Sequence, residues 1–298
     1  MLESYDAAGT RTIKLNTGWQ LPHDSNSGRL LPSENGDYFA WLQAGGQSVL
    51  VFDSTSNQST TLELSGRTVD AGWLRLNGAA PPRLAVVTSD SRTVLLDPSN
   101  HEQLSGSSAA PPLAVIAYEQ VASPVGGLVF LQDRSVEQLQ LSEESTLSRI
   151  PGRPAAFAKP SSPGVVADKL GFTPAAGPWK SIRTEQGNLT LAHGWLAADE
   201  PAVFMLDNQF NQLWHARMPL ELPGAWHLTT AWQNPATGQP VWAVVDETNT
   251  VHLFRADGRS NDHFRVAERI VGVSLLAEAS QLLLRIVTPH ETITHALR

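Results

Sequence analysis

Side chains that could bind a metal ion occur along the whole chain, but their spacing does not bring a ligand set together. None of the nine His residues stands four positions from another His beside a Glu, which is the spacing typical of helical zinc sites. His290 and His295 are five positions apart in an expected strand, so their side chains should point to opposite faces. Residues 257–262 offer several oxygen donors near Gly258, but they lack the alternating acids and the final Glu of a calcium loop. We therefore expect solvated histidines and a polar hairpin turn, with no metal and no other cofactor.

Nucleophilic catalysis has no clear signature in this sequence either. The chain contains no Cys, which excludes disulfides, thiolate metal sites and a cysteine nucleophile. Ser, His and Asp are plentiful, but no Gly-x-Ser-x-Gly turn is present to expose a serine nucleophile, and residues 105–108 have only the composition of a loop. The sequence thus leans against an enzyme.

Composition and charge narrow the class of partner. The 298 residues include 22 Gly and 20 Pro, and 41% are hydrophobic and 17% charged, as in a globular chain rich in turns. The net charge of −8 argues against a nucleic-acid partner, because phosphate binding depends on clustered Lys and Arg. No apolar run approaches the ~20 residues that cross a bilayer, so no membrane span is expected. The first six residues lack the pattern of a signal peptide, which fits the cytoplasm, or the periplasm if an export signal was removed.

A recurring pair of short apolar runs is the clearest pattern in the chain. In its first copy, residues 39–42 and 49–53 are separated by Gly45 and Gly46, and the second run ends in Asp53. Runs of Val, Leu and Phe bounded by turn-forming residues are typical of β-hairpins. Further hairpins of this kind are expected at residues 85–97, 128–140, 195–207, 243–255 and 283–295.

The hairpins recur at intervals typical of a four-stranded repeat. Successive copies are 40 to 48 residues apart, except for one step of 67 residues, and the blades of β-propellers repeat at ~40–50 residues. Another strand-like run precedes most hairpins, and a fourth follows several of them, as at residues 60–64. No stretch sustains an apolar helix pattern, so helix should stay below ~10%. We therefore predict one all-β domain over residues 1–298, a single β-propeller of six or seven four-stranded blades.

The long step contains a Pro-rich irregular segment at residues 150–178. Its six prolines make it a poor host for central strands, because proline cannot donate a ladder hydrogen bond. Either residues 164–168 belong to a degenerate seventh blade, or the segment is an insertion between two blades of a six-bladed ring. The spacing slightly favours seven blades. The prolines also predict that this segment is the most exposed and protease-sensitive part of the chain.

Residues 203–214 resemble the repeat of quinoprotein-like and WD40-like propellers. In the quinoprotein-type repeat an apolar strand ends in Leu-Asp, turns through a Gly and reaches a Trp. Here Leu206 and Asp207 match, Asn211 stands at the glycine position and Trp214 comes one residue early. The resemblance implies that Asp207 caps the turn, that Asn211 adopts the positive φ, and that Trp214 packs between blades. It implies the propeller fold but no cofactor, because a quinone-dependent dehydrogenase needs a larger ring and a charged cofactor cradle.

Two aromatic residues are the candidate binding residues. Trp226 and His227 follow a loop at residues 222–225 and stand at the entry of an expected inner strand, near one opening of the central channel, where propellers commonly bind. A packed position for Trp226 is the alternative. Trp41, Trp195 and Trp242 lie in or next to apolar runs and are expected in the core.

A propeller without a convergent catalytic set favours a non-catalytic interaction platform. Its channel face or its Pro-rich segment would bind a protein or peptide. The alternative is a propeller hydrolase, similar to a lactonase, whose channel metal is held by carboxylate and Asn side chains from different blades. Such a site would have no local motif, and the same fold serves many functions.

The two ends of the chain are expected to close the ring. The last repeat, residues 270–298, supplies three strands, one fewer than a complete blade. Residues 11–15 alternate polar and apolar side chains, as a half-buried outer strand does, and no hairpin partner is expected nearby. Because an open sheet edge leaves backbone donors unpaired, we predict that residues 10–16 complete the blade of residues 270–298. The N- and C-terminal strands would then pair.

Overall fold

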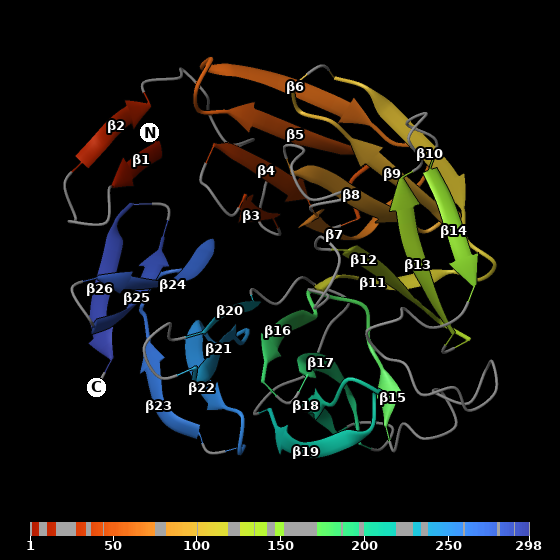
Figure 1. Ribbon diagram of the computed structural model, residues 1–298. Coiled ribbons are helices and arrows are strands. Elements are labelled where there is room, and N and C mark those ends of the chain that lie inside the picture. Colours follow the sequence, from red (N-terminus) through yellow and green to blue (C-terminus); the bar gives the residue numbers. More distant parts are fainter. Residues whose placement is uncertain are drawn as a thin grey trace.

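The computed structural model shows an all-β chain arranged as a ring (Figure 1). It describes residues 2–5, 11–15, 28–33, 37–43, 45–74, 82–99, 101–118, 126–133, 135–141, 147–151, 172–185, 187–196, 200–218, 229–233, 238–258, 260–278, 281–288 and 290–297. No helix occurs within these ranges. The predicted all-β class is confirmed.

Six antiparallel sheets form the blades, which are numbered here in chain order. Blade 1 contains β3 (Gly28–Pro32), β4 (Tyr38–Gln43), β5 (Ser48–Asp53) and β6 (Gln58–Glu63), and blade 2 contains β7 (Thr68–Leu74), β8 (Arg83–Thr88), β9 (Arg92–Leu96) and β10 (Gln103–Ser107). Blade 3 contains β11 (Pro112–Tyr118), β12 (Gly126–Leu131), β13 (Val136–Leu141) and β14 (Leu147–Pro151), and blade 4 contains β15 (Thr173–Pro174), β16 (Lys180–Thr184), β17 (Gly187–Trp195), β18 (Pro201–Leu206) and β19 (Gln212–Arg217). Blade 5 contains β20 (Thr229–Gln233), β21 (Pro240–Val245), β22 (Thr250–Arg255) and β23 (Ser260–Arg265), and blade 6 contains β24 (Gly272–Glu278), β25 (Gln281–Val287) and β26 (Thr292–Leu297).

Contacts between the innermost strands close the ring. These strands are β3, β7, β11, β16, β20 and β24; each contacts the next, and β24 contacts β3. The described residues therefore form six blades, and the slight preference for seven was wrong. Between β14 and β15 the described strands include no further sheet. Residues 164–168, considered for a seventh blade, lie outside the described residues.

The hydrophobic core is divided among the boundaries between blades. Every residue of β8 is buried, because both faces of this strand meet a neighbouring blade. Leu84 and Val86 pack against blade 1, whereas Ala85 and Val87 pack against blade 3. Burial on both faces explains the nearly continuous apolar run of this strand. Similar clusters join blade 3 to blade 4, blade 4 to blade 5 and blade 5 to blade 6.

Two of the three tryptophans expected in the core are fully buried. Trp41 on β4 and Trp242 on β21 are 4% and 0% exposed. Trp195, at the end of β17, is half-buried.

The outer strands are more exposed than the strands inside the blades. Strands β10 and β19 alternate between exposed and half-buried residues along their length.

The turn after β18 confirms one part of the expected repeat and corrects another. Asp207 caps the turn: its Oδ1 accepts hydrogen bonds from the backbone N–H groups of Gln209 and Asn211, at 2.8 Å each. Phe210, not Asn211, adopts the positive φ, of 58°. The Asn211 side chain also donates to Asp207, at 2.9 Å, which fixes it in the turn. The Phe210 ring is buried near Phe130 of blade 3, and this packing offsets the cost of the left-handed backbone.

The described ends of the Pro-rich segment are structured. Strand β14 extends to Pro151, and β15 pairs Thr173 with Trp195. Phe172 is buried and stacks on Phe204 with ring centroids 3.7 Å apart. Residues 152–171 lie outside the described residues. The irregular character predicted for residues 150–178 stays a prediction for the residues between these ends.

The N-terminal strand is present, but its observed partner differs from the expected one. Strands β1 (Leu2–Tyr5) and β2 (Arg11–Leu15) form a separate antiparallel hairpin, with Ser4 opposite Ile13. The expectation that β2 has no hairpin partner nearby was wrong. In the view of Figure 1 this hairpin is drawn between β26 and blade 1. Pairing of β2 with blade 6 stays a prediction.

Candidate functional site

The two predicted binding residues lie outside the described part of the chain. Trp226 and His227 fall in residues 219–228. The next strand after them, β20, is the innermost strand of blade 5, in agreement with the expected order along the chain. Their role in binding stays a prediction.

A buried polar contact joins blades 4 and 5 at the beginning of β20. His193 on β17 is 1% exposed, and its Nε2 lies 3.0 Å from Oγ1 of Thr229. A buried polar group is costly unless it is hydrogen-bonded, so this contact helps to fix the position of one blade against the next. Neither residue carries a local signal in the sequence, because the two are 36 positions apart.

A buried carboxylate plays a similar part between blades 2 and 3. Asp70 on β7 is fully buried, and its Oδ2 accepts a hydrogen bond of 2.8 Å from the backbone N–H of Val115 on β11. Both strands belong to the inner ring. The carboxylate is thus used in joining two inner strands.

The boundary between blades 1 and 2 contains a small hollow with a polar rim. The blade 1–2 hollow has a volume of about 140 Å³, and its lining residues are Val51, Asp53, Ser56, Gln58, Thr60, Leu96, Pro98, Ser99 and His101. Val51, Leu96 and Pro98 are buried and form an apolar floor. The other six residues are polar, and all are exposed or half-buried. The hollow can therefore receive a group with an apolar body and a polar tip.

Two turns from different blades bound the hollow. Asp53 ends β5 and caps the turn before β6: its Oδ1 accepts from the N–H groups of Thr55 and Ser56, at 2.7 and 3.2 Å. In blade 2, Asp97 caps the equivalent turn by accepting from the Ser99 N–H at 2.9 Å. Across the boundary, Oγ1 of Thr60 lies 2.9 Å from Nδ1 of His101. These contacts hold both walls of the hollow in place.

Asp53 is the acidic residue in the lining of the hollow. Partial burial acts to raise the pKa of Asp53, but hydrogen bonds from Ser56 and Thr55 outweigh it and hold this pKa below its usual value. Asp53 is therefore anionic at neutral pH. The pKa of the nearby Tyr38 phenol is raised, first by burial and then by the carboxylates of Asp53, Asp37 and Asp97.

An ion pair within blade 2 supports the turn that Asp97 caps. Nη2 of Arg83 lies 3.1 Å from Oδ2 of Asp97, and both side chains are more than nine-tenths buried. The Asp97 carboxylate thus holds the turn with Oδ1 and the neighbouring strand with Oδ2. The Arg83 guanidinium is used behind the turn and does not line the hollow.

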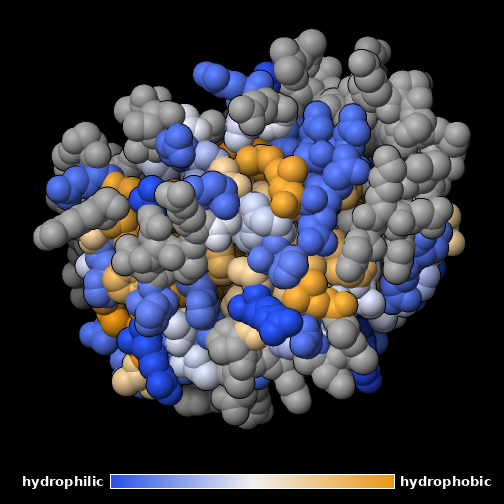
Figure 2. All heavy atoms as spheres, turned by 90° about the horizontal axis from the view of Figure 1, so that it is seen from below, coloured by the Kyte–Doolittle hydropathy of each residue, from blue (hydrophilic) through white to orange (hydrophobic). Residues whose placement is uncertain are grey.

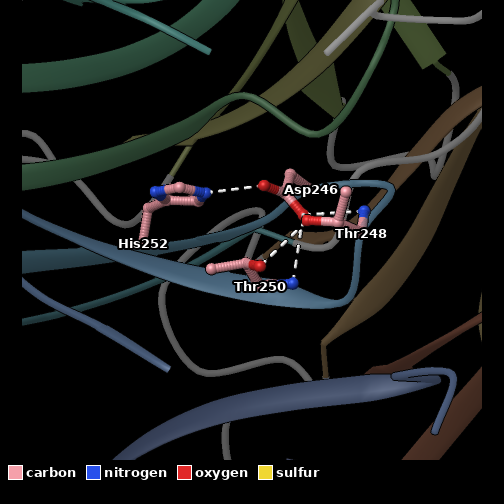
Figure 3. A network of polar contacts seen from close by, with 4 residues as sticks. All are labelled: Asp246, Thr248, Thr250 and His252. Atoms are coloured by element: carbon pink, nitrogen blue, oxygen red, sulfur yellow. Dashed lines mark hydrogen bonds and ion pairs between the residues drawn. The ribbon is translucent and has the colours of Figure 1, made fainter. Parts of the chain in front are cut away.

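A second polar network lies in the β21–β22 turn of blade 5 (Figure 3). Oδ1 of Asp246 accepts from the N–H groups of Thr248 and Thr250, at 2.8 and 3.0 Å, and from the Thr248 hydroxyl at 2.7 Å. Its Oδ2 lies 2.7 Å from Nε2 of His252. A catalytic triad requires a hydroxyl bonded to the imidazole, whereas here the Thr248 hydroxyl bonds the carboxylate. The network therefore stabilises a turn.

The surface near β19 exposes both hydrophobic and hydrophilic residues. Figure 2, seen from below, shows hydrophobic atoms in small separate patches between hydrophilic ones. Leu213 on β19 is a large apolar residue with 52% of its surface exposed. Small, scattered patches of this kind are common on protein surfaces.

The described ranges contain neither a metal-binding cluster nor a membrane-spanning helix. No group of three or more His, Asp or Glu side chains there is arranged to hold a metal ion. No helix in that part of the chain is long and apolar enough to span a membrane.

The hollow was missed by sequence reasoning for an identifiable reason. The repeat did mark Asp53 and Asp97 as the residues that end the third strands. What it could not show is that residues 51–60 and 96–101 come together across a blade boundary. The equivalent position of the two turns was the one signal available.

Comparison with known proteins places the chain by its fold. No family profile and no curated protein matches the sequence. Among solved structures, the Cps50 (Swd1) β-propeller domain of Myceliophteria thermophila has a TM-score of 0.53 and 12% identity, covering 94% of this chain and 87% of that one. BamB from Moraxella catarrhalis has a TM-score of 0.51 and 11% identity, covering 97% and 89%. BBS1N in complex with ARL6DN, from a mercury-soaked crystal, has a TM-score of 0.51 and 11% identity, covering 87% and 74%.

At these identities the likeness concerns the fold. The described residues supply the same information independently, as six antiparallel sheets whose inner strands contact one another around a ring. The chain is thus a six-bladed β-propeller.

Proposed function

We propose that the chain is a non-catalytic platform that binds a protein or peptide. The observation that carries the proposal is the blade 1–2 hollow. Its volume of about 140 Å³ is below the ~300–1,000 Å³ typical of small-molecule sites. A hollow of this size at a blade boundary suits one side chain of a larger partner better than a whole substrate.

The structures with a similar fold agree with a protein partner. One of them, BBS1N, was crystallised in complex with ARL6DN. A ring whose blades pack against each other is a rigid support, and rigid surfaces bind with a smaller loss of conformational entropy. The net charge of −8 supports a protein or peptide partner over a nucleic acid.

Trp226 and His227 form the second proposed contact region. Large aromatic side chains are enriched among the residues that contribute most to binding. Replacement of Trp226 by Ala should weaken partner binding at least about tenfold if this residue contacts the partner. If it is packed in the ring, the same variant should instead lower the melting temperature.

Affinity capture tests the platform directly. The immobilised chain is incubated with an extract of its native organism, and retained proteins are identified by mass spectrometry; an immobilised BamB propeller serves as the matched control for general adhesion. Each specific candidate is then purified and titrated against the chain by calorimetry. A saturable complex of defined stoichiometry supports the proposal, and the absence of any direct binder contradicts it.

The hydrolase alternative makes a different prediction. An enzyme with a channel metal should contain about one divalent ion per chain when purified under native conditions. Elemental analysis combined with a panel of ester and lactone substrates measures both properties. Stoichiometric metal together with turnover would replace the platform by the enzyme.

A further inference from the structure

We propose that the blade 1–2 hollow binds the side chain of a lysine presented by a protein partner. The inference rests on the proposed platform function and names the chemistry that one of its sites recognises. Its basis is the shape of the hollow, the placement of Asp53 and the acceptors left free around it.

The size of the hollow fits one long side chain. An apolar cavity of about 150 Å³ in another protein holds one benzene molecule, so a volume of about 140 Å³ takes roughly six heavy atoms. The buried residues Val51, Leu96 and Pro98 form an apolar floor, and Asp53 stands at the polar rim. A lysine has the matching division, because its four-carbon stem packs on apolar surface while the ammonium stays among polar groups.

The charge of the lining selects a cation. The lining residues contain the Asp53 carboxylate and no Lys or Arg. The imidazole of His101 is held by its Nδ1 contact with Thr60. Asp97 does not line the hollow and is paired with Arg83 at 3.1 Å, so Asp53 supplies the negative charge of the lining. This charge would repel an anionic ligand and attract an ammonium ion.

The hydrogen bonds of Asp53 favour lysine over arginine. Its Oδ1 already accepts two backbone N–H groups, and its Oδ2 accepts the Ser56 hydroxyl at 2.8 Å. An ionised carboxylate has about four acceptor positions, which leaves one, on Oδ2. An arginine fork bonds both carboxylate oxygens in one plane, but an ammonium needs a single acceptor and directs its other N–H groups elsewhere. The exposed rim residues Gln58 and Ser99 offer oxygen atoms for them.

Amino-acid derivatives test the inference without knowledge of the partner. The probes are Nα-acetyl-lysine amide, which keeps its side-chain ammonium, and the equivalent derivatives of arginine and glutamate. A fourth probe, Nα-acetyl-norleucine amide, keeps the apolar stem but lacks the ammonium. Binding is followed by amide chemical-shift mapping. We expect the lysine probe to shift the amides of Ser56, Ser99 and His101, and to bind more tightly than the other three. Equal binding of norleucine, or shifts located elsewhere, would overturn the proposal.

Two variants test the role of the charge. Asp53→Asn should weaken the lysine probe about tenfold, the loss expected for one hydrogen bond to a charged group. Asp207→Asn is the matched control, because Asp207 caps the equivalent turn of blade 4, and it should leave binding unchanged. If Asp53→Asn melts early, Ser99→Lys replaces it: a fixed ammonium at the exposed rim should abolish binding, while Gln132→Lys, on an exposed turn of blade 3, should not.

The outcome separates this inference from the platform function. If a partner binds wild type and Asp53→Asn equally and the lysine probe does not bind, the lysine site is wrong and the platform stands. If the probe binds in the hollow and no protein partner is found, the platform is wrong and the lysine site stands. A partner whose affinity falls with Asp53→Asn, and whose binding weakens at high salt, supports both.

Discussion

Trp214 joins blades 4 and 5 by both packing and a hydrogen bond. Its ring lies 5.8 Å from that of Phe254, measured between centroids, and its Nε1 donates to the backbone oxygen of Ala256 at 2.7 Å. The expected position of this residue between blades is confirmed. Gly258 has a φ of 81°, and a Cβ atom there would lie 3.1 Å from the Trp214 ring, so the two residues fit closely.

Replacement of Trp214 should therefore destabilise the ring. Trp214→Ala should lower the free energy of unfolding by about 2 kcal/mol, less than a fully buried Trp because the side chain is half-buried. Trp214→Phe keeps the ring contact and removes the N–H donor, so its loss should be about 1 kcal/mol. Urea unfolding measures both, and equal losses for the two variants would contradict the packing contribution.

Asp246 should make the stability of the chain depend on pH. Burial acts to raise the pKa of Asp246, but hydrogen bonds from His252, Thr248 and Thr250 outweigh it and hold the pKa below its usual value. A carboxyl group whose pKa is lowered by folding contributes stability above its unfolded pKa, and this contribution is lost as the pH falls through the folded pKa.

The variant Asp246→Asn should thus be less stable than wild type at neutral pH, by about 1–2 kcal/mol, and the difference should shrink in acid. Thr248→Ser keeps the hydroxyl and the backbone donor, so its acid dependence should follow wild type. Denaturant unfolding at a series of pH values gives the comparison. A constant difference between Asp246→Asn and wild type would contradict the assigned role.

At the scale of elements, blade 6 has fewer described strands than any other blade. Blade 6 has three described strands, and β2 pairs with β1. We still predict that residues 10–16 complete blade 6. Deletion of residues 1–17 should then lower the melting temperature on the order of 5 °C and promote aggregation, because a sheet edge becomes exposed.

A shorter deletion distinguishes the two roles of the hairpin. Removal of residues 1–5 takes away β1 alone, so it should be tolerated if β2 has a partner in blade 6. Calorimetry and light scattering report the melting temperature and the aggregation. A protein lacking residues 1–17 that melts like the full chain and stays monomeric would disprove closure by the N-terminal strand.

The Pro-rich segment should be the first site of proteolysis. Cleavage is expected within residues 150–178, and the described contacts confine it further. Phe172 and Ala175 are buried, and the Ala175 N–H donates to the backbone oxygen of His193 at 2.9 Å, which protects the end of the segment. Mass spectrometry of early fragments locates the cut. Initial cleavage in the hairpins near residues 85–97 or 243–255 would instead indicate that the segment is packed and protected.

At the scale of the whole molecule, the sequence predicted the hairpins better than the ring. All six hairpins expected from the repeat are present, from β4–β5 to β25–β26. Their signal is local, because short apolar runs and turn residues are adjacent in the chain. The prediction of six or seven blades is confirmed, but the slight preference for seven was wrong because residues 128–195 break the repeat. The inner strand β16 was not recognised among the prolines of this stretch.

The candidate site was less predictable than the fold. Trp226 and His227 were chosen from their place before an inner strand, and they lie outside the described residues. The blade 1–2 hollow depends on how two blades meet, and a pattern read within each repeat contains no information on that. Asp53 and Asp97 could be recognised as turn residues from the sequence. That their two turns bound one hollow is evident only once blades 1 and 2 are packed together.

The shared apolar clusters determine how the chain must be made. Each of the five clusters draws residues from two successive blades, so a blade leaving the ribosome has one face that only the next blade covers. At about 5–20 residues per second, synthesis of 298 residues takes about 15–60 s. Throughout that time the most recently synthesised blade has an apolar face that no other blade covers. Chaperones that bind apolar segments therefore have a target on this protein until blade 6 is complete.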